Sequence, residues 1–99
     1  MEDKQMTQQM IVNLVNLEMG KHGNFTGTCI ELRKTLETAE IGTAFSFKSN
    51  NPYHDCSSTF EKIEKDVWMQ TYTVNGKIEQ STKIDERQAA SEIANEVIA

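Results

Sequence analysis

A two-residue turn at Asn75-Gly76 constrains this chain more than any other feature of its sequence. Asn and Gly adopt the positive φ angles of a type I′ turn, and here they lie between two runs rich in β-branched and aromatic residues. This combination is the strongest short-range signal of a β-hairpin. We therefore predict a hairpin within residues 58–84, in which Val74 lies opposite Lys77 and the pairs continue outward in strict succession.

The turn also predicts which side chains share a face of the sheet, because side chains alternate across a strand. The face predicted to line the core carries Val67, Met69, Thr71, Thr73, Ile78, Gln80, Thr82 and Ile84. The opposite face carries Trp68, Gln70, Tyr72, Val74, Lys77, Glu79, Ser81 and Lys83. A shift of one residue in the pairing would exchange the two faces.

Two segments repeat apolar residues every three or four positions, which is typical of helices that bury one side. The first runs from Lys4 to Met19. The second follows Asp85, which forms an N-terminal capping box with Gln88, and continues to Ile98. We predict an N-terminal helix and a C-terminal helix, the latter packed on the sheet.

The segment from Thr28 to Ile41 fits either a helix or a strand. A capping box at Thr28 and Glu31, with apolar residues at helical spacing behind it, favours a second helix. The alternation of Thr28, Ile30 and Leu32 fits a strand instead. We predict the helix and retain the strand as the alternative.

Two further stretches complete the predicted sheet. Residues 43–48 alternate as a strand does, and a loop with the chain's only proline, Pro52, follows them. Phe60 and Ile63 are three residues apart and therefore out of phase, which predicts a bulge or an early strand end. The expected fold is α+β: a three- or four-stranded antiparallel meander, with helices on one or both faces, in a single domain spanning residues 1–99.

Composition limits the classes of function. The chain has 99 residues and a net charge of −5, and no run approaches the roughly 20 apolar residues of a membrane helix. Its polar N-terminus shows no secretory signal, so we expect a cytoplasmic protein. Because nucleic-acid binders normally present a basic surface, direct binding to DNA or RNA is the less favoured alternative, as a nucleic-acid-binding regulator.

Few residues could carry chemistry. The candidates for a metal site or a nucleophile are His22, Cys29, His54, Asp55 and Cys56. Zinc sites have close pairs of cysteine or histidine, and a nucleophilic cysteine needs an oriented base. Neither pattern is present, so we predict no catalytic residue, no metal and no cofactor. A small metal- or thiol-dependent enzyme using His54 and Cys56 is the alternative hypothesis.

The remaining hypothesis is a non-enzymatic protein-binding module, an inhibitor or adaptor of the kind that phages and other mobile elements encode. Its predicted contact residues are two aromatic side chains, either exposed anchors or covered core, and four acidic ones that could occupy a partner's basic nucleic-acid groove. They are Trp68, Tyr72, Glu61, Glu64, Asp66 and Glu79. An open sheet edge or the alanine-rich C-terminal helix would also allow a homodimer.

Overall fold

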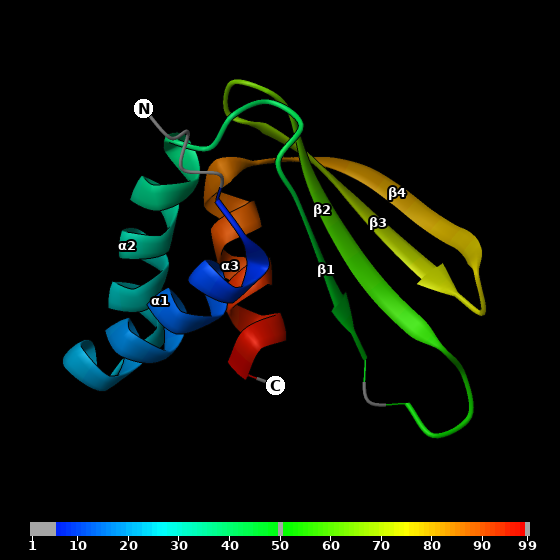
Figure 1. The fold of residues 1–99 in the computed structure, drawn as a ribbon, viewed down its shortest axis with the longest axis horizontal. Coiled ribbons are helices and arrows are strands. Elements are labelled where there is room, and N and C mark those ends of the chain that lie inside the picture. The colour runs from blue at the N-terminus through cyan, green and yellow to red at the C-terminus, as the bar shows by residue number, and fades with distance from the viewer. Residues whose placement is uncertain (1–5, 50, 99) are drawn as a thin grey trace.

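The computed structural model describes residues 6–49 and 51–98 and has the predicted α+β architecture, with N-terminal helices, an antiparallel meander and a C-terminal helix. Its elements are α1 (Gln8–His22), α2 (Phe25–Glu37), β1 (Ala44–Lys48), β2 (Cys56–Glu64), β3 (Val67–Val74), β4 (Lys77–Asp85) and α3 (Glu86–Ile98). Figure 1 shows the sheet beside a layer of helices. The first two residues of the predicted N-terminal segment, Lys4 and Gln5, lie outside the described residues.

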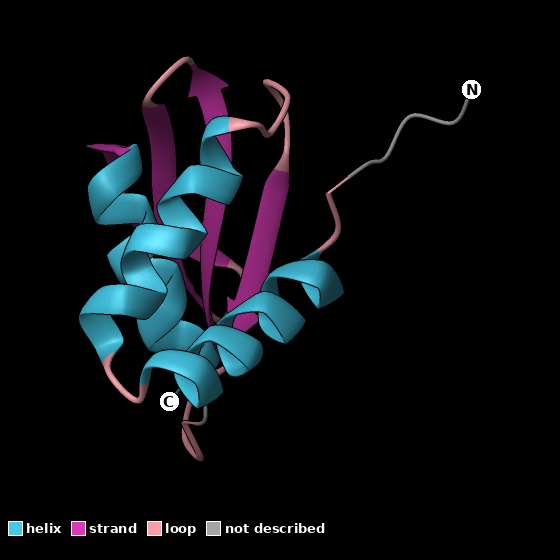
Figure 2. Ribbon diagram, turned by 90° about the vertical axis from the view of Figure 1, so that its left-hand side faces the viewer, coloured by secondary structure: helices cyan, strands magenta, loops and turns pink. Residues whose placement is uncertain are grey.

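The four strands form one sheet in the order β1-β2-β3-β4, and every neighbouring pair is antiparallel. The three helices all lie on the same side of this sheet (Figures 1 and 2). Within the described residues, no helix covers the opposite side. We call the two sides the helix-covered face and the uncovered face.

The ambiguous segment is helical, but α2 begins before the predicted capping box. The side chain of Asn24 caps the helix by accepting a hydrogen bond from the Gly27 amide, 2.7 Å away. The Thr28 hydroxyl does not cap; it donates to the Asn24 carbonyl within the first turn. Gly23, with φ at 65°, ends α1 in the left-handed region and so separates the two helices. No helix in the described part of the chain has the length and apolar character needed to span a membrane.

The hairpin turn is as predicted, and the register beyond it is not. Asn75 and Gly76 have φ angles of 52° and 81°, and Val74 pairs with Lys77. A β-bulge then leaves Glu79 without a partner, so Tyr72 lies opposite Gln80 rather than Glu79. Every later pair is shifted by one residue. A second bulge, between Lys62 and Glu64 of β2, lies where the spacing of apolar residues predicted an irregularity.

The assignment of faces in β3 was wrong. Trp68 lies fully inside the core, opposite Ile84, and its ring stacks on that of Phe45 with 6.1 Å between centroids. Met69 lies half-buried on the uncovered face. The Trp68 indole therefore packs on the helix-covered face, because burial on that face removes most of its surface from water. Ile78, predicted to be core, is 69% exposed.

A row of hydroxyl groups crosses the uncovered face. Ser46, Thr59, Thr71 and Ser81 lie directly opposite one another on the four successive strands. The Ser46 and Thr59 hydroxyl oxygens are 3.1 Å apart, and those of Thr71 and Ser81 are 3.3 Å apart. Small polar side chains joined in pairs therefore occupy the middle of the face that no described helix covers.

The core contains a buried ion pair that the sequence did not reveal. The Lys62 ammonium lies 2.7 Å from the Glu86 carboxylate, and both side chains are 4% exposed. The Trp68 indole nitrogen donates to the same carboxylate, 3.2 Å away. Lys62 also donates to the main-chain carbonyls of Leu36 and Glu37 at 3.0 and 3.3 Å. This network joins β2, β3, the end of α2 and the start of α3. Glu86, the first residue of α3, is therefore a core residue.

The start of α3 is capped from two directions. As predicted, the Asp85 carboxylate accepts a hydrogen bond from the Gln88 amide, 2.8 Å away. The Asp66 carboxylate, in the β2–β3 turn, accepts from the Glu86 amide, 3.2 Å away. These two contacts hold the first turn of α3, and with it the Glu86 side chain, against the sheet.

Removing one member of the buried pair should destabilise the fold strongly. Glu86→Leu leaves the Lys62 ammonium buried without its counter-charge, so we expect a loss of about 3–5 kcal/mol in the free energy of unfolding, measured by urea denaturation. The double variant Lys62→Met with Glu86→Leu should lose less than the sum of the single variants. Glu37→Leu, which breaks an exposed contact to Arg33, is the control and should cost less than about 1 kcal/mol. Equal losses for Glu86→Leu and Glu37→Leu would show that the buried pair of Lys62 and Glu86 does not hold the fold together.

Candidate functional site

The end of the sheet that points away from the helices is tied together by one residue. Figure 1 shows the β1–β2 loop and the β3–β4 turn side by side at this end. The Asn75 amide donates to the Asp55 carbonyl at 2.7 Å, and the Asp55 amide donates to the Asn75 side-chain oxygen at 2.9 Å. The Asn75 side-chain nitrogen lies 3.3 Å from Nδ1 of His54. The positive φ that the turn requires thus also positions Asn75 to clamp the loop.

Three large side chains are exposed around this clamp. Tyr53, in the loop, is 86% exposed, and Ile78, on the uncovered face of β4, is 69% exposed. Tyr72, on the helix-covered face of β3, is 38% exposed. We call these three residues the distal tip. Exposed tyrosines held on a rigid frame are a common feature of protein interfaces.

Only one member of the distal tip was among the predicted contact residues. Tyr72 was predicted from its place in the hairpin, whereas Ile78 was assigned to the core. Tyr53 was not among the predicted contact residues. A large aromatic residue directly after Pro52 in an otherwise polar loop was the signal that could have identified it.

Tyr72 lies near one of the two cysteines. Cys56, at the start of β2, is buried and lies diagonally across from Tyr72 on the same face of the sheet. Hydrogen bonding to the Cys56 thiol raises the pKa of the Tyr72 phenol, and the negative charges of Glu96 and Glu79 raise it further.

The other candidate residues for chemistry do not meet. His54 is exposed and bonded to Asn75, whereas Cys56 is buried, and the amide of Asn51 lies 3.9 Å from its sulfur. His22 contacts Glu18 at 3.0 Å on α1. Cys29 is a half-buried thiol of α2 whose pKa is raised by burial. Among residues 6–49 and 51–98, no three His, Cys, Asp or Glu side chains come together as a metal site would require.

The four predicted acidic contact residues are divided between the two ends of the sheet. Glu61 lies on the uncovered face opposite Met69, and Glu64 and Asp66 lie at the β2–β3 turn. Glu79 lies at the bulge near the other end of β3, a strand of eight residues that extends about 25 Å at 3.3 Å per residue. The Asp66 carboxylate is also engaged in capping α3. The structure therefore places these residues too far apart for one acidic patch.

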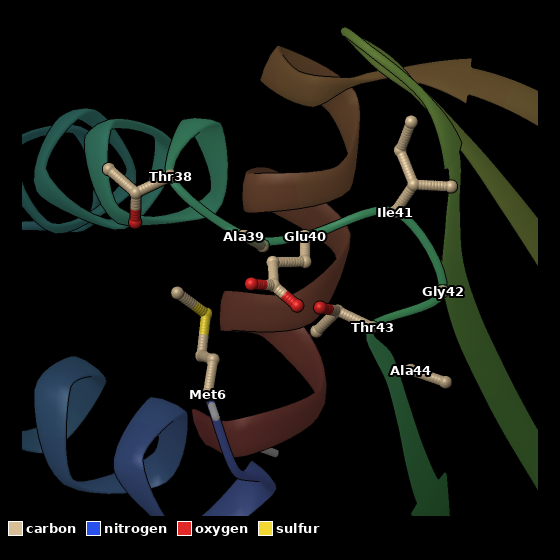
Figure 3. A pocket seen from close by; sticks show the side chains of 8 residues that line it. All are labelled: Met6, Thr38, Ala39, Glu40, Ile41, Gly42, Thr43 and Ala44. Carbon is tan, nitrogen blue, oxygen red and sulfur yellow. The ribbon is translucent and has the colours of Figure 1, made fainter. Parts of the chain in front are cut away.

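A hollow lies at the opposite end of the sheet from the distal tip. It has a volume of about 540 Å³ and lies between Met6 and the segment that joins α2 to β1. Figure 3 shows the Glu40 carboxylate and the Thr43 hydroxyl side by side, with the Met6 side chain directed toward them. Glu40 is the one ionisable residue among those that line it, so the hollow does not join a nucleophile to a base.

Comparison with known proteins finds no similarity that identifies the chain: no family model, no curated protein and no solved structure matches it. Its function is therefore inferred from its own residues and their positions. Of the surfaces described, the distal tip combines exposed aromatic residues with a hydrogen-bonded frame.

Removing the Asn75 side chain should release the loop. Asn75→Gly keeps a residue that tolerates positive φ but loses the side-chain bonds to the Asp55 amide and to His54, while the main-chain bond to the Asp55 carbonyl remains. We expect a loss of about 1–2 kcal/mol in the free energy of unfolding and faster amide exchange across residues 51–55. Asn75→Asp keeps the acceptor for the Asp55 amide, so its free energy of unfolding should lie between those of the wild type and Asn75→Gly. Unchanged exchange in Asn75→Gly would show that the clamp does not order the loop.

The pKa of Tyr72 should be measurably raised. In a Tyr53→Phe protein the remaining tyrosine is Tyr72, so alkaline absorbance titration reports it alone. We expect a midpoint above the ordinary value of about 10, and a lower midpoint after Cys56→Ala. Because the folded-state pKa is raised, its contribution to stability is complete below the unfolded-state pKa and is lost as pH rises through the folded-state value. A midpoint unaffected by Cys56→Ala would exclude the hydrogen bond as its cause.

Proposed function

We propose that the protein is a non-enzymatic protein-binding module, an inhibitor or adaptor, and that the distal tip is its contact surface. The observation that supports this most directly is the clamp at Asn75, which holds an otherwise irregular loop against a hairpin turn. The loop carries Tyr53, the most exposed large hydrophobic side chain among the described residues.

Rigidity matters because binding has to overcome the entropy of ordering the contact residues. A loop already fixed by three hydrogen bonds loses less conformational freedom on association than a free loop would. Tyrosine adds large contact area with few rotatable bonds and can also donate a hydrogen bond. Tyr53 and Tyr72 are therefore suited to serve as anchors, with Ile78 as an apolar neighbour.

The partner that we propose carries a basic surface. The net charge of −5 favours positively charged partners during diffusional encounter. A protein that imitates nucleic acid needs its carboxylates close together, and Glu79 lies far along the sheet from Glu61 and Glu64. An adaptor or inhibitor that docks through aromatic anchors fits this arrangement better than one that fills a nucleic-acid groove. Two unbonded cysteines are compatible with the reducing cytoplasm, where we propose that the protein acts.

Substitutions at the distal tip should abolish partner binding without unfolding the protein. The tagged protein captures its partner from the native host, and the affinity of the purified partner is then measured by calorimetry. We expect Tyr53→Ala and Ile78→Ser each to weaken binding by about tenfold or more, the loss typical of an anchor residue. Ile41→Ser is the matched control, since Ile41 is 68% exposed and lies at the other end of the sheet.

Circular dichroism establishes that each variant keeps the fold. Wild-type affinity in both Tyr53→Ala and Ile78→Ser would exclude the distal tip as the contact surface. A loss confined to Ile41→Ser would assign binding to the α2–β1 segment instead.

A further inference from the structure

The two edges of the sheet differ in how far they are protected. At the β1 edge, the Ser46 amide donates to the side-chain oxygen of Gln8, 2.9 Å away, so a residue of α1 occupies that edge. At the other edge, β4 is the last strand, and every residue from Lys77 to Lys83 is exposed. In Figure 1, no described element lies beyond β4. An open edge of this kind presents main-chain donors and acceptors to another strand.

The charges along β4 are complementary to themselves in one register. The strand reads Lys-Ile-Glu-Gln-Ser-Thr-Lys-Ile-Asp from Lys77 to Asp85. Placed antiparallel to a second copy and centred on Ser81, the strand sets Glu79 opposite Lys83 of the copy. Because the arrangement is two-fold symmetric, this oppositely charged pair occurs twice.

Neighbouring registers lose this pair. Centring the pairing on Gln80 sets Glu79 opposite Ser81, and centring it on Thr82 sets Glu79 opposite Asp85, a pair of like charges. Like charges directly opposite in a sheet are destabilising, whereas opposite charges stabilise. Charged residues on an edge commonly prevent pairing altogether. Here one register gains two oppositely charged pairs and its neighbours gain none, which is the pattern expected of a selected register.

We propose that β4 pairs with β4 of a second copy of this chain, antiparallel and centred on Ser81. The bulge at Glu79 ends the regular alternation of β4, so the ladder extends from Glu79 to Lys83, and Lys77 is not part of it. The two-fold axis runs perpendicular to the sheet, so the helices of both copies lie on one side. The uncovered faces then form one surface across eight strands.

This inference does not depend on the distal tip, because its charged pairs involve none of the three residues of that surface. Glu79 and Lys83 are exposed in the single chain, so reversing their charges leaves the core untouched. The two proposals therefore fail or succeed separately in experiments on different residues.

A charge swap tests the pairing directly. Sedimentation velocity over a range of concentrations gives the dimer dissociation constant of the wild-type chain, Glu79→Lys, Lys83→Glu and the double variant. Each single reversal creates two like-charged contacts and should raise the dissociation constant by about tenfold or more. The double variant restores opposite charges in the same register, so its dissociation constant should return close to the wild-type value. Added salt should weaken both the wild-type and the double-variant dimer.

Several outcomes would overturn the proposal. One is a wild-type chain that stays monomeric at every concentration, including a monomer whose β4 edge instead binds an extended segment of a different protein. Another is a dimer that neither single reversal weakens, or a double variant no better than the single ones. Tyr53→Ala serves as the control and should dimerise as the wild type does, which separates this result from failure of the distal tip.

Discussion

The contact between Lys62 and Glu86 determines how the layers of this protein fit together. A charged pair can stay inside a core only if its remaining hydrogen-bonding groups are also satisfied, since neither ion is hydrated there. The indole of Trp68 and two carbonyls at the end of α2 supply those partners. Within the described residues, no buried side-chain nitrogen or oxygen lacks a partner. The pair therefore requires β2, β3, α2 and α3 to meet at one place, which keeps two of the three helices on the same side of the sheet.

Local signals in the sequence were enough for the elements of the fold. The Asn75-Gly76 turn and the Asp85 cap each depend on a few adjacent residues, and both are present in the structure as predicted. The bulge at Glu79 could not be predicted, because the turn fixes only the first pairs and nothing nearby marks an extra residue. The burial of Lys62 could not be predicted from the sequence either. Its partner lies 24 positions away in the sequence, and only the packed fold brings the two together.

The candidate site was less predictable than the fold. Choosing between the two faces of β3 required knowing which one the helices cover, and the alternation of the strand is compatible with both. Trp68 was assigned to the wrong face for this reason. Tyr53 gains its position from a clamp between residues 20 apart in the chain. Sequence periodicity carries no information about such a contact.

The row of hydroxyls on the uncovered face has a consequence for how a half-covered sheet avoids stacking. Two bare sheets gain stability by face-to-face packing when apolar side chains interdigitate between them. Here the central side chains are Ser46, Thr59, Thr71 and Ser81, already bonded in pairs and still able to accept water. Removing that water would leave the polar groups without hydrogen-bond partners and would gain little dispersion energy. Hydration thus takes the place of a second helical layer.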